Sequence, residues 1–243
     1  MSQRFTVSSR TGLTDGLPQQ SIFACVRALH DRISSRFILV GGASAAILGS
    51  RRTTKDVDIL VSDSSIMQVL QMAQGFEVTD GKLYFKEATM DEAVPIDILT
   101  TVDDSLGFQD LNAHTTSLDG IHVLKLDIAM AVKVKCAYLR TNDNHGAEKR
   151  RSDLRDAVFL ARKLKETGLT ISDDCATLFA VGYYHMIFLR FNMLGSEFEE
   201  LIDVGIEKLL IPWNENTAEQ QEYYLCFAPE GSDPLTVELD EDA

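Results

Sequence analysis

Two aspartates separated by a single residue, Asp56 and Asp58, constrain this chain more than any other feature. They lie in the segment 55–61 (KDVDILV), whose apolar residues predict a buried strand. Alternation along a strand directs both carboxylates to one face of the sheet. Like charges side by side repel, so we expect a positive group between them, and a hard divalent cation such as Mg²⁺ suits carboxylate oxygens. The alternative is an exposed strand edge where the carboxylates pair with the neighbouring bases Arg51, Arg52 and Lys55.

A pair of glycines, Gly41 and Gly42, follows the apolar run 36–40 (RFILV), which predicts another buried strand. Glycines without a Cβ allow a phosphate to approach the backbone, and the N–H groups of a helix predicted at 43–48 would face it. Ser44 adds a hydroxyl. A tight strand-to-helix turn would use the glycines equally well. Neither a Walker loop nor a G-x-G-x-x-G motif is present.

A third acid, Asp97, is the lone charge in the apolar strand signal 94–100 (VPIDILT). The turn pair Asp80-Gly81 predicts that the strands between Phe76 and Thr100 are antiparallel neighbours. A carboxylate on an apolar strand needs a partner, because its desolvation costs several kcal/mol. If this strand lies beside that of Asp56, three carboxylates converge, which is the arrangement that holds one or two metal ions about 3.5–4 Å apart for phosphoryl or nucleotidyl transfer.

The order of these features resembles a known family. A double glycine after a strand, then Gly49, then Arg52-x-Thr54-x-Asp56-Val57-Asp58 and a later strand aspartate are similar to the nucleotidyltransferase superfamily typified by DNA polymerase beta and the antibiotic nucleotidyltransferases. The R-x-T-x-D-h-D form is that of its minimal and AbiEii-like toxin members. The resemblance covers about Phe37 to Asp156. It implies metal-dependent transfer of a nucleoside monophosphate from an NTP, such as ATP, to an acceptor hydroxyl, with Mg²⁺ as the cofactor and Mn²⁺ as the alternative.

The resemblance also implies roles for particular residues. Asp56, Asp58 and Asp97 match the metal-binding and catalytic carboxylates, and the third helps to deprotonate the attacking hydroxyl. Lys133, in the helix predicted at 126–140, matches a lysine that reaches the triphosphate, although Lys133 and Lys135 could equally extend to solvent. For the next helix we predict internal pairing, for instance of Lys149 with Asp153. The matched nucleotide-binding positions are Gly41, Gly42, Ser44, Arg52, Thr54 and Lys133.

The fold class we predict is α+β, a nucleotidyltransferase-like mixed sheet flanked by helices and followed by a helical C-terminal region. The expected parts are a loose arm (1–16), the core (17–124), the helical region (125–228) and an acidic tail (229–243). Periodicity predicts helices at 21–33, 43–48, 65–74, 126–140 and 149–165, with 173–210 largely helical. The uncharged run 175–189 is too short to span a membrane and predicts one buried helix.

Charge restricts the partners. Of 37 acids and 23 bases, 16 acids and 2 bases lie from Thr167 onward, so the excess of −14 belongs to the last third and residues 1–166 are neutral, with 21 of each. A net negative charge argues against binding to long nucleic acid. It leaves room for an NTP, for a small-molecule or protein acceptor, and for a tRNA end at the basic group Lys149, Arg150, Arg151 and Arg155.

Two alternatives to an active transferase stay open. One is an inactive protein that keeps the fold for binding or regulation, and the other is a toxin-like member that modifies tRNA. The acceptor, the preferred NTP and the oligomeric state are not specified by these patterns. Four widely spaced cysteines and a polar N-terminus without an apolar run favour a reducing, cytoplasmic location, and the five histidines share no ligand spacing.

Overall fold

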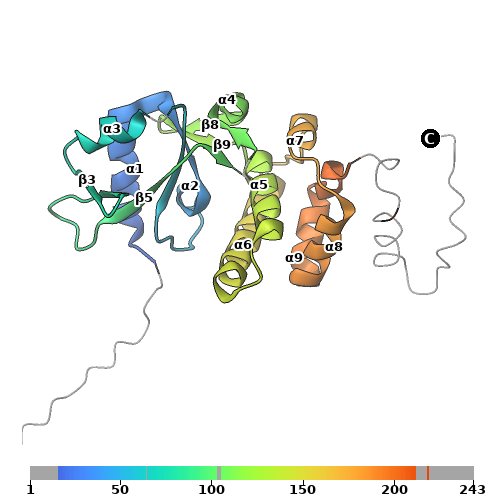
Figure 1. Cartoon of the computed structure of the whole chain (residues 1–243). Coiled ribbons are helices and arrows are strands. Elements are labelled where there is room, and N and C mark those ends of the chain that lie inside the picture. Colours follow the sequence, from blue (N-terminus) through green and yellow to red (C-terminus); the bar gives the residue numbers. More distant parts are fainter. Residues whose placement is uncertain (1–15, 64, 103–104, 212–217, 219–243) are drawn as a thin grey trace, which may run out of the picture. The chain divides into compact units, whose positions relative to one another are not determined.

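The structure is a computed structural model that describes residues 16–63, 65–102, 105–211 and residue 218. The chain divides into two compact units (Figure 1). The first runs to Val102 and resumes at Leu106–Val123, and the second contains residues 103–105 and everything from Leu124 onward. The predicted arm, residues 1–15 of it, and the predicted acidic tail lie outside the described residues.

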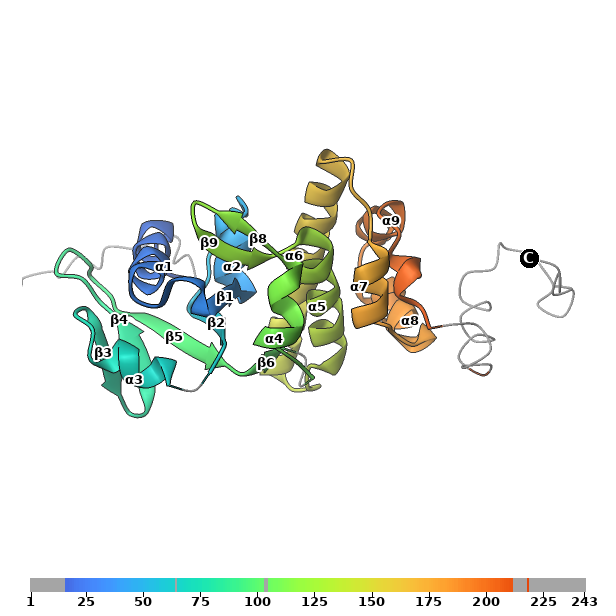
Figure 2. The same ribbon diagram turned by 90° about the horizontal axis from the view of Figure 1, so that it is seen from above.

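The first unit is built on a seven-stranded mixed sheet in the order β3-β4-β5-β2-β1-β9-β8, which confirms the predicted fold class (Figure 2). Parallel pairs join β2 to β5 and β1 to β9, whereas β1–β2, β4–β5 and β3–β4 are antiparallel. The hairpin predicted at Asp80-Gly81 is therefore present. The strands are β1 (Phe37–Val40), β2 (Val57–Val61), β3 (Phe76–Thr79), β4 (Lys82–Phe85), β5 (Val94–Leu99), β8 (Thr115–Leu118) and β9 (Ile121–Leu124).

The central strands are buried because their apolar residues alternate into a core. Val57, Ile59 and Val61 of β2 join one core cluster with residues of α1 (Gln19–Ile33) and α3 (Ile66–Gln71), while Leu60 is buried on the other face. Five apolar residues of α1 that follow the helical repeat are buried, namely Ile22, Cys25, Val26, Leu29 and Ile33. Burying such side chains contributes roughly 1.5–3 kcal/mol each, which holds the strand that carries Asp58 in place.

Two boundaries differ from prediction near the double glycine. Helix α2 (Gly41–Ile47) begins at the glycines themselves, directly after β1, and not at Ala43. Gly41 has φ +65, a conformation that glycine adopts without strain. Strand β2 begins at Val57, so Asp56 lies just before the strand.

Between Thr101 and Gly120, where the sequence patterns above predict no helix or strand, the structure has several short elements. Strand β8 pairs at the sheet edge next to β9, and the turn between them contains Asp119 and Gly120, both with positive φ. Strand β8 is polar (TTSL), so it gives no apolar alternation, but its Asp-Gly turn was a signal that could have revealed the hairpin. The other elements are β6 (Thr101–Val102), β7 (Leu106–Gly107), α4 (Phe108–Leu111) and η2 (Asn112–His114).

The second unit is helical up to residue 211, as predicted, and residues 212–217 and 219–228 of the predicted helical region lie outside the described residues. Helices α5 and α6 pack together along their length, and α6 buries one apolar face that contains Leu154, Val158, Ala161 and Leu164. Helix α6 begins at Asn144, earlier than predicted, because the Asp143 side chain caps it by accepting from the Gly146 N–H at 2.6 Å. The helices are α5 (Leu126–Leu139), α6 (Asn144–Glu166), α7 (Asp173–Leu178), α8 (Tyr183–Asn192), α9 (Gly195–Asp203) and η3 (Ile206–Leu209).

The single helix predicted for 175–189 is wrong, because the chain breaks between α7 and α8. Val181 leaves helical geometry to pair with Leu210, and Gly182 then starts α8. Tyr183 is buried, but Tyr184 is 38% exposed and does not belong to the core. None of the helices in the described residues is long and apolar enough to cross a membrane.

Candidate metal and nucleotide site

Asp56, Asp58 and Asp97 converge, as the sequence predicts for neighbouring strands. Strand β2 runs parallel to β5 with Asp58 opposite Asp97, and Asp56 lies one residue before β2. Each residue offers one carboxylate oxygen, and these three oxygens lie within 4.8 Å of one another. Among the described residues, this is the group of histidine, cysteine or acidic side chains close enough to share a metal ion.

The environment suits a hard cation. Asp56 and Asp58 are half-buried and Asp97 is exposed, so the strands fix the carboxylates while solvent and ligands can reach them. Three ionised carboxylates this close repel one another, and a divalent cation relieves that repulsion by accepting oxygens from each. The donor set therefore fits one or two ions of the Mg²⁺ or Mn²⁺ type and does not resemble the cysteine- and histidine-rich sites of structural zinc.

Gly41 has no side chain, and the Asp58 carboxylate occupies the space that a Cβ would fill. A Cβ on Gly41 would overlap Oδ2 of Asp58, and Val40, the residue before it, is paired with Asp58 across β1 and β2. The glycine therefore has a role that can be named without a ligand, since it permits the end of β1 to approach an aspartate of the site. Its positive φ adds a second reason why a larger residue would not fit.

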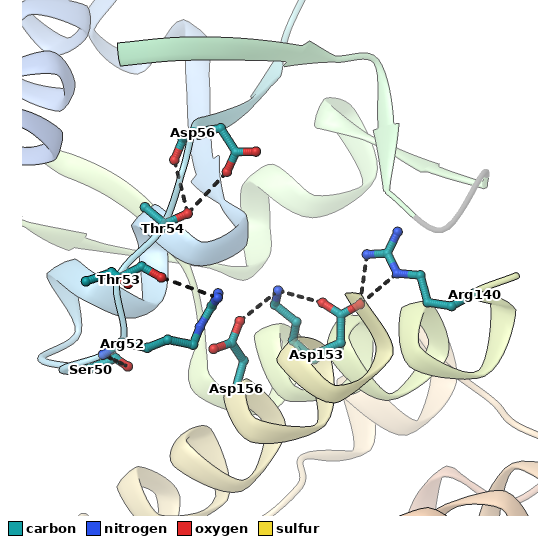
Figure 3. Close-up of polar contacts among 9 residues, drawn as sticks. Ser50, Arg52, Thr53, Thr54, Asp56, Arg140, Asp153 and Asp156 are labelled. Atoms are coloured by element: carbon teal, nitrogen blue, oxygen red, sulfur yellow. Dashed lines mark hydrogen bonds and ion pairs between the residues drawn. The ribbon is translucent and has the colours of Figure 1, made fainter. Parts of the chain in front are cut away.

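Thr54 lies in the loop before β2 and forms hydrogen bonds with Asp56 and Leu17. Its buried hydroxyl donates to Oδ1 of Asp56 at 3.1 Å, with the Asp56 carbonyl oxygen at 3.3 Å (Figure 3). Its carbonyl oxygen accepts from the Leu17 N–H at 2.8 Å. Gly42 lies against the same side chain, since a Cβ there would stand 2.5 Å from Thr54 Oγ1 and 2.8 Å from an Arg52 guanidinium nitrogen.

The predicted nucleotide-binding residues therefore fall into two groups. Gly41, Gly42, Arg52 and Thr54 gather around the aspartates in the first unit, and Ser44 is buried in the first turns of α2. Lys133 belongs to α5 in the second unit.

Lys133 has two carboxylate partners within its own unit. Its ammonium lies 2.9 Å from Asp153 Oδ1 and 3.0 Å from Asp156 Oδ2, and Arg140 pairs with the other oxygen of Asp153 at 2.8 Å (Figure 3). Burial by itself would lower the pKa of Lys133, but the carboxylates of Asp156 and Asp153 outweigh it and hold the pKa above its usual value. The lysine is thus charged and only 14% exposed. It does not extend freely into solvent.

Sequence reasoning missed this cluster. We predicted that Asp153 pairs within its helix, for instance with Lys149, but among the described residues its partners are Lys133 on α5 and Arg140, the residue that follows α5. The signal was present, because Lys133 stands among apolar residues on α5 and Asp153 and Asp156 are three apart on α6, so both acids lie on one helix face. What the sequence lacked was the register in which the two helices pack.

The two buried thiols, Cys25 and Cys175, are not suited to nucleophilic chemistry. Burial raises the pKa of the Cys25 thiol, and burial followed by the nearby Asp127 carboxylate raises the pKa of Cys175 to about 12. Both thiols therefore stay protonated at neutral pH, and a protonated thiol is a poor nucleophile. Asp127 itself has a structural role, because it accepts from the Ser172 N–H at 3.2 Å and from its hydroxyl at 2.5 Å, joining α5 to the start of α7.

Comparison with known proteins gives structural matches alone. No family model and no curated protein matches the sequence. The fold is similar to an antigenic nucleotidyltransferase-like protein from Paracoccidioides brasiliensis, at 15% identity and a TM-score of 0.49 over 76% of this chain and 94% of that one. Two proteins from Helicobacter pylori are also similar, one described as a candidate nucleotidyltransferase (17% identity, TM-score 0.44, 79% and 94%) and one named JHP933 (15%, 0.43, 79% and 92%).

Proposed function

We propose that this protein is a metal-dependent nucleotidyltransferase that moves a nucleoside monophosphate from an NTP to an acceptor hydroxyl. The observation that carries the proposal is the convergence of Asp56, Asp58 and Asp97 at the parallel β2–β5 pair, beside a double glycine. The three carboxylates would hold one or two Mg²⁺ ions, or Mn²⁺ ions, which neutralise charge on the phosphates when bound.

The chain's own residues supply positioning and a proton acceptor. Asp58, placed over Gly41, and Asp56, held by Thr54, would fix the ligand oxygens, and the backbone of Gly41 and Gly42 with Arg52 would receive phosphates. Asp97 is the exposed acid of the three, which supports a role for it as the acceptor of the proton of an incoming hydroxyl. The hydroxyl oxygen then bonds to the α-phosphorus as the bond to pyrophosphate breaks. Such chemistry depends on orientation and charge more than on a covalent intermediate.

Calorimetric titration of each NTP in the presence of Mg²⁺ tests this proposal. We expect saturable, metal-dependent binding by the wild type and none by Asp56→Asn/Asp58→Asn. A matched control, Asp31→Asn/Glu77→Gln, removes two exposed acids from α1 and β3 and should bind as the wild type does. Absence of binding by all four NTPs would refute the proposal.

Transfer itself needs a second experiment, because an inactive binding protein would pass the titration. With the NTP identified, we expect release of pyrophosphate and incorporation of α-labelled nucleotide into a small molecule or a protein of a host extract, lost in Asp97→Asn. Tight binding without any transfer would favour the regulatory alternative. Transfer to tRNA would favour the toxin-like one.

A further inference from the structure

Large apolar side chains line one side of α8 and the turn after it. Phe191 is 72% exposed, Leu194 is 68% exposed and Tyr184 is 38% exposed. At about 100° per residue, Tyr184, Phe188 and Phe191 fall within an arc of roughly 60°, so they share one helix face. Together with Leu194 we call them the α8 stripe. An exposed cluster of apolar side chains commonly marks a surface that another molecule or segment covers.

The stripe is anchored to the body of the second unit. Phe188 meets the Tyr138 ring edge-on, with ring centroids 5.5 Å apart, and the Arg150 guanidinium lies 5.5 Å from the Phe188 ring centre. Met186 and Leu189, on the opposite side of the helix, are fully buried. The stripe is therefore held in place by a rigid element, and its outer side chains are not a sign of local unfolding.

The continuous described segment 105–211 ends beside the start of α8. The Val181 N–H donates to the Leu209 carbonyl at 2.7 Å, and the Ile211 N–H donates to the Val181 carbonyl at 3.0 Å. Tyr183, the first residue of α8, is two residues from Val181. Residue 212 thus follows a residue that is fixed next to the helix. The ten residues of α8 extend about 15 Å, a length that residues 212–228 can cover whether helical or extended.

The composition of residues 212–228 complements the stripe. The segment is rich in aromatic and aliphatic side chains, and its charged residues are all acidic, whereas Arg150 and Arg190 flank the stripe on α6 and α8. Aromatic residues in an otherwise polar segment gain stability by stacking on an aromatic surface. The apolar members are Trp213, Tyr223, Tyr224, Leu225 and Phe227, and the acids are Glu215, Glu219 and Glu222.

We propose that residues 212–228 dock in cis on the α8 stripe and cover Phe191 and Leu194. Attachment at Ile211 gives the segment an effective concentration in the millimolar range, far above that of a second copy of the chain under ordinary conditions. Docking would remove the apolar surface from solvent and leave the acids at its rim beside the two arginines. This inference is independent of nucleotidyl transfer.

Trp213 is the sole tryptophan of the chain, so its fluorescence reports on this segment alone. We expect acrylamide to quench Trp213 several-fold less in the native protein than in the same protein in urea. Phe191→Ser/Leu194→Ser should abolish that protection. Both side chains are exposed, so the variant should keep its fold, which circular dichroism checks. Met72→Ser/Val78→Ser, which removes two exposed apolar side chains from the first unit, is the control and should leave the protection unchanged.

Dilution distinguishes docking by residues 212–228 of the same chain from docking by a second copy of the chain. Protection that stays constant when the protein is diluted a hundredfold supports docking in cis. Protection that disappears on dilution would overturn the proposal and assign the stripe to a second copy. Quenching in the native wild type equal to that in urea would also overturn it, as would protection that survives Phe191→Ser/Leu194→Ser.

Discussion

At the scale of residues, one hydroxyl proton orients one of the three carboxylates. Thr54 is buried and donates to Asp56, so it has little surface left for a nucleotide, and we expect its contribution to be the positioning of Asp56. Thr54→Val keeps the shape but removes the donor. Losing a hydrogen bond to a charged group costs about 1.5–3 kcal/mol, so we expect at least about tenfold weaker binding of Mn²⁺.

Electron paramagnetic resonance, which detects free Mn²⁺, measures the affinity for Mn²⁺ without any assay of activity. Thr54→Ser keeps the hydroxyl and should bind nearly as the wild type does. Thr53→Val, at the exposed neighbouring position, is the matched control and should have no effect. Unchanged affinity in Thr54→Val would show that the backbone before β2 positions Asp56 without the Thr54 hydroxyl.

Single residues also explain which parts of the site could be predicted. Asp56, Asp58 and Asp97 could be found because charges that interrupt apolar strands need partners, and the period of two assigns them a face. The partner of Lys133 could not be found, because Asp153 is 20 residues away on another helix and the contact depends on how the two helices pack. The support that Thr54 gives to Asp56 was missed for a different reason. The motif includes the threonine but does not indicate whether its hydroxyl faces a ligand or a neighbour.

At the scale of elements, the contact between α5 and α8 contains a titratable group. His185 on α8 stacks on Tyr138 of α5, with ring centroids 3.8 Å apart, and its buried Nδ1 has no hydrogen-bond partner among the described residues. Burial lowers the pKa of His185 to about 4, with the charge of Lys135 acting in the same direction and the Gly182 backbone opposing it. The folded protein thus prefers the neutral ring.

The sign of the resulting pH dependence follows from the lowered pKa. Above about pH 6.5 the ring is neutral in both the folded and the unfolded protein. Protonation of His185 therefore takes nothing from the free energy of unfolding there. As pH falls from 6.5 to about 4, the unfolded chain takes up a proton that the folded chain does not, and stability decreases. The full shift would correspond to about 3 kcal/mol, and partial solvent exposure of the ring reduces this to about 1–2 kcal/mol.

Urea denaturation at pH 7 and pH 4 measures this effect. His185→Phe keeps the stacking and removes the titration, so its loss of unfolding free energy between the two pH values should be smaller than that of the wild type by about 1–2 kcal/mol. Exposed His145→Gln serves as the control, with a loss equal to that of the wild type. An equal loss in His185→Phe would mean that the ring is protonated in the folded state.

At the scale of the whole molecule, charge separates along the chain. Residues 1–166 contain 21 acids and 21 bases, and residues 167–243 contain 16 acids and 2 bases. The basic group considered for tRNA is also smaller than it looked in sequence. Arg150 is engaged with backbone carbonyls, among them those of Ala137 and Arg140, and it contacts Phe188. Lys149, Arg151 and Arg155 are exposed.

Three exposed bases on an acidic protein can neutralise few phosphates. We therefore expect bulk tRNA to bind more weakly than about 10⁻⁵ M at physiological salt, within the range of non-specific binding. The salt dependence should be shallow, because each neutralised phosphate of a single strand adds only about 0.7 to the slope of log K against log salt. Filter binding between 50 and 200 mM salt, with Arg151→Gln/Arg155→Gln beside the wild type, measures both quantities. Tight binding with a steep slope that the double variant removes would instead identify tRNA as a partner of this protein, because it would mean that local charge on α6 prevails over the acidic total.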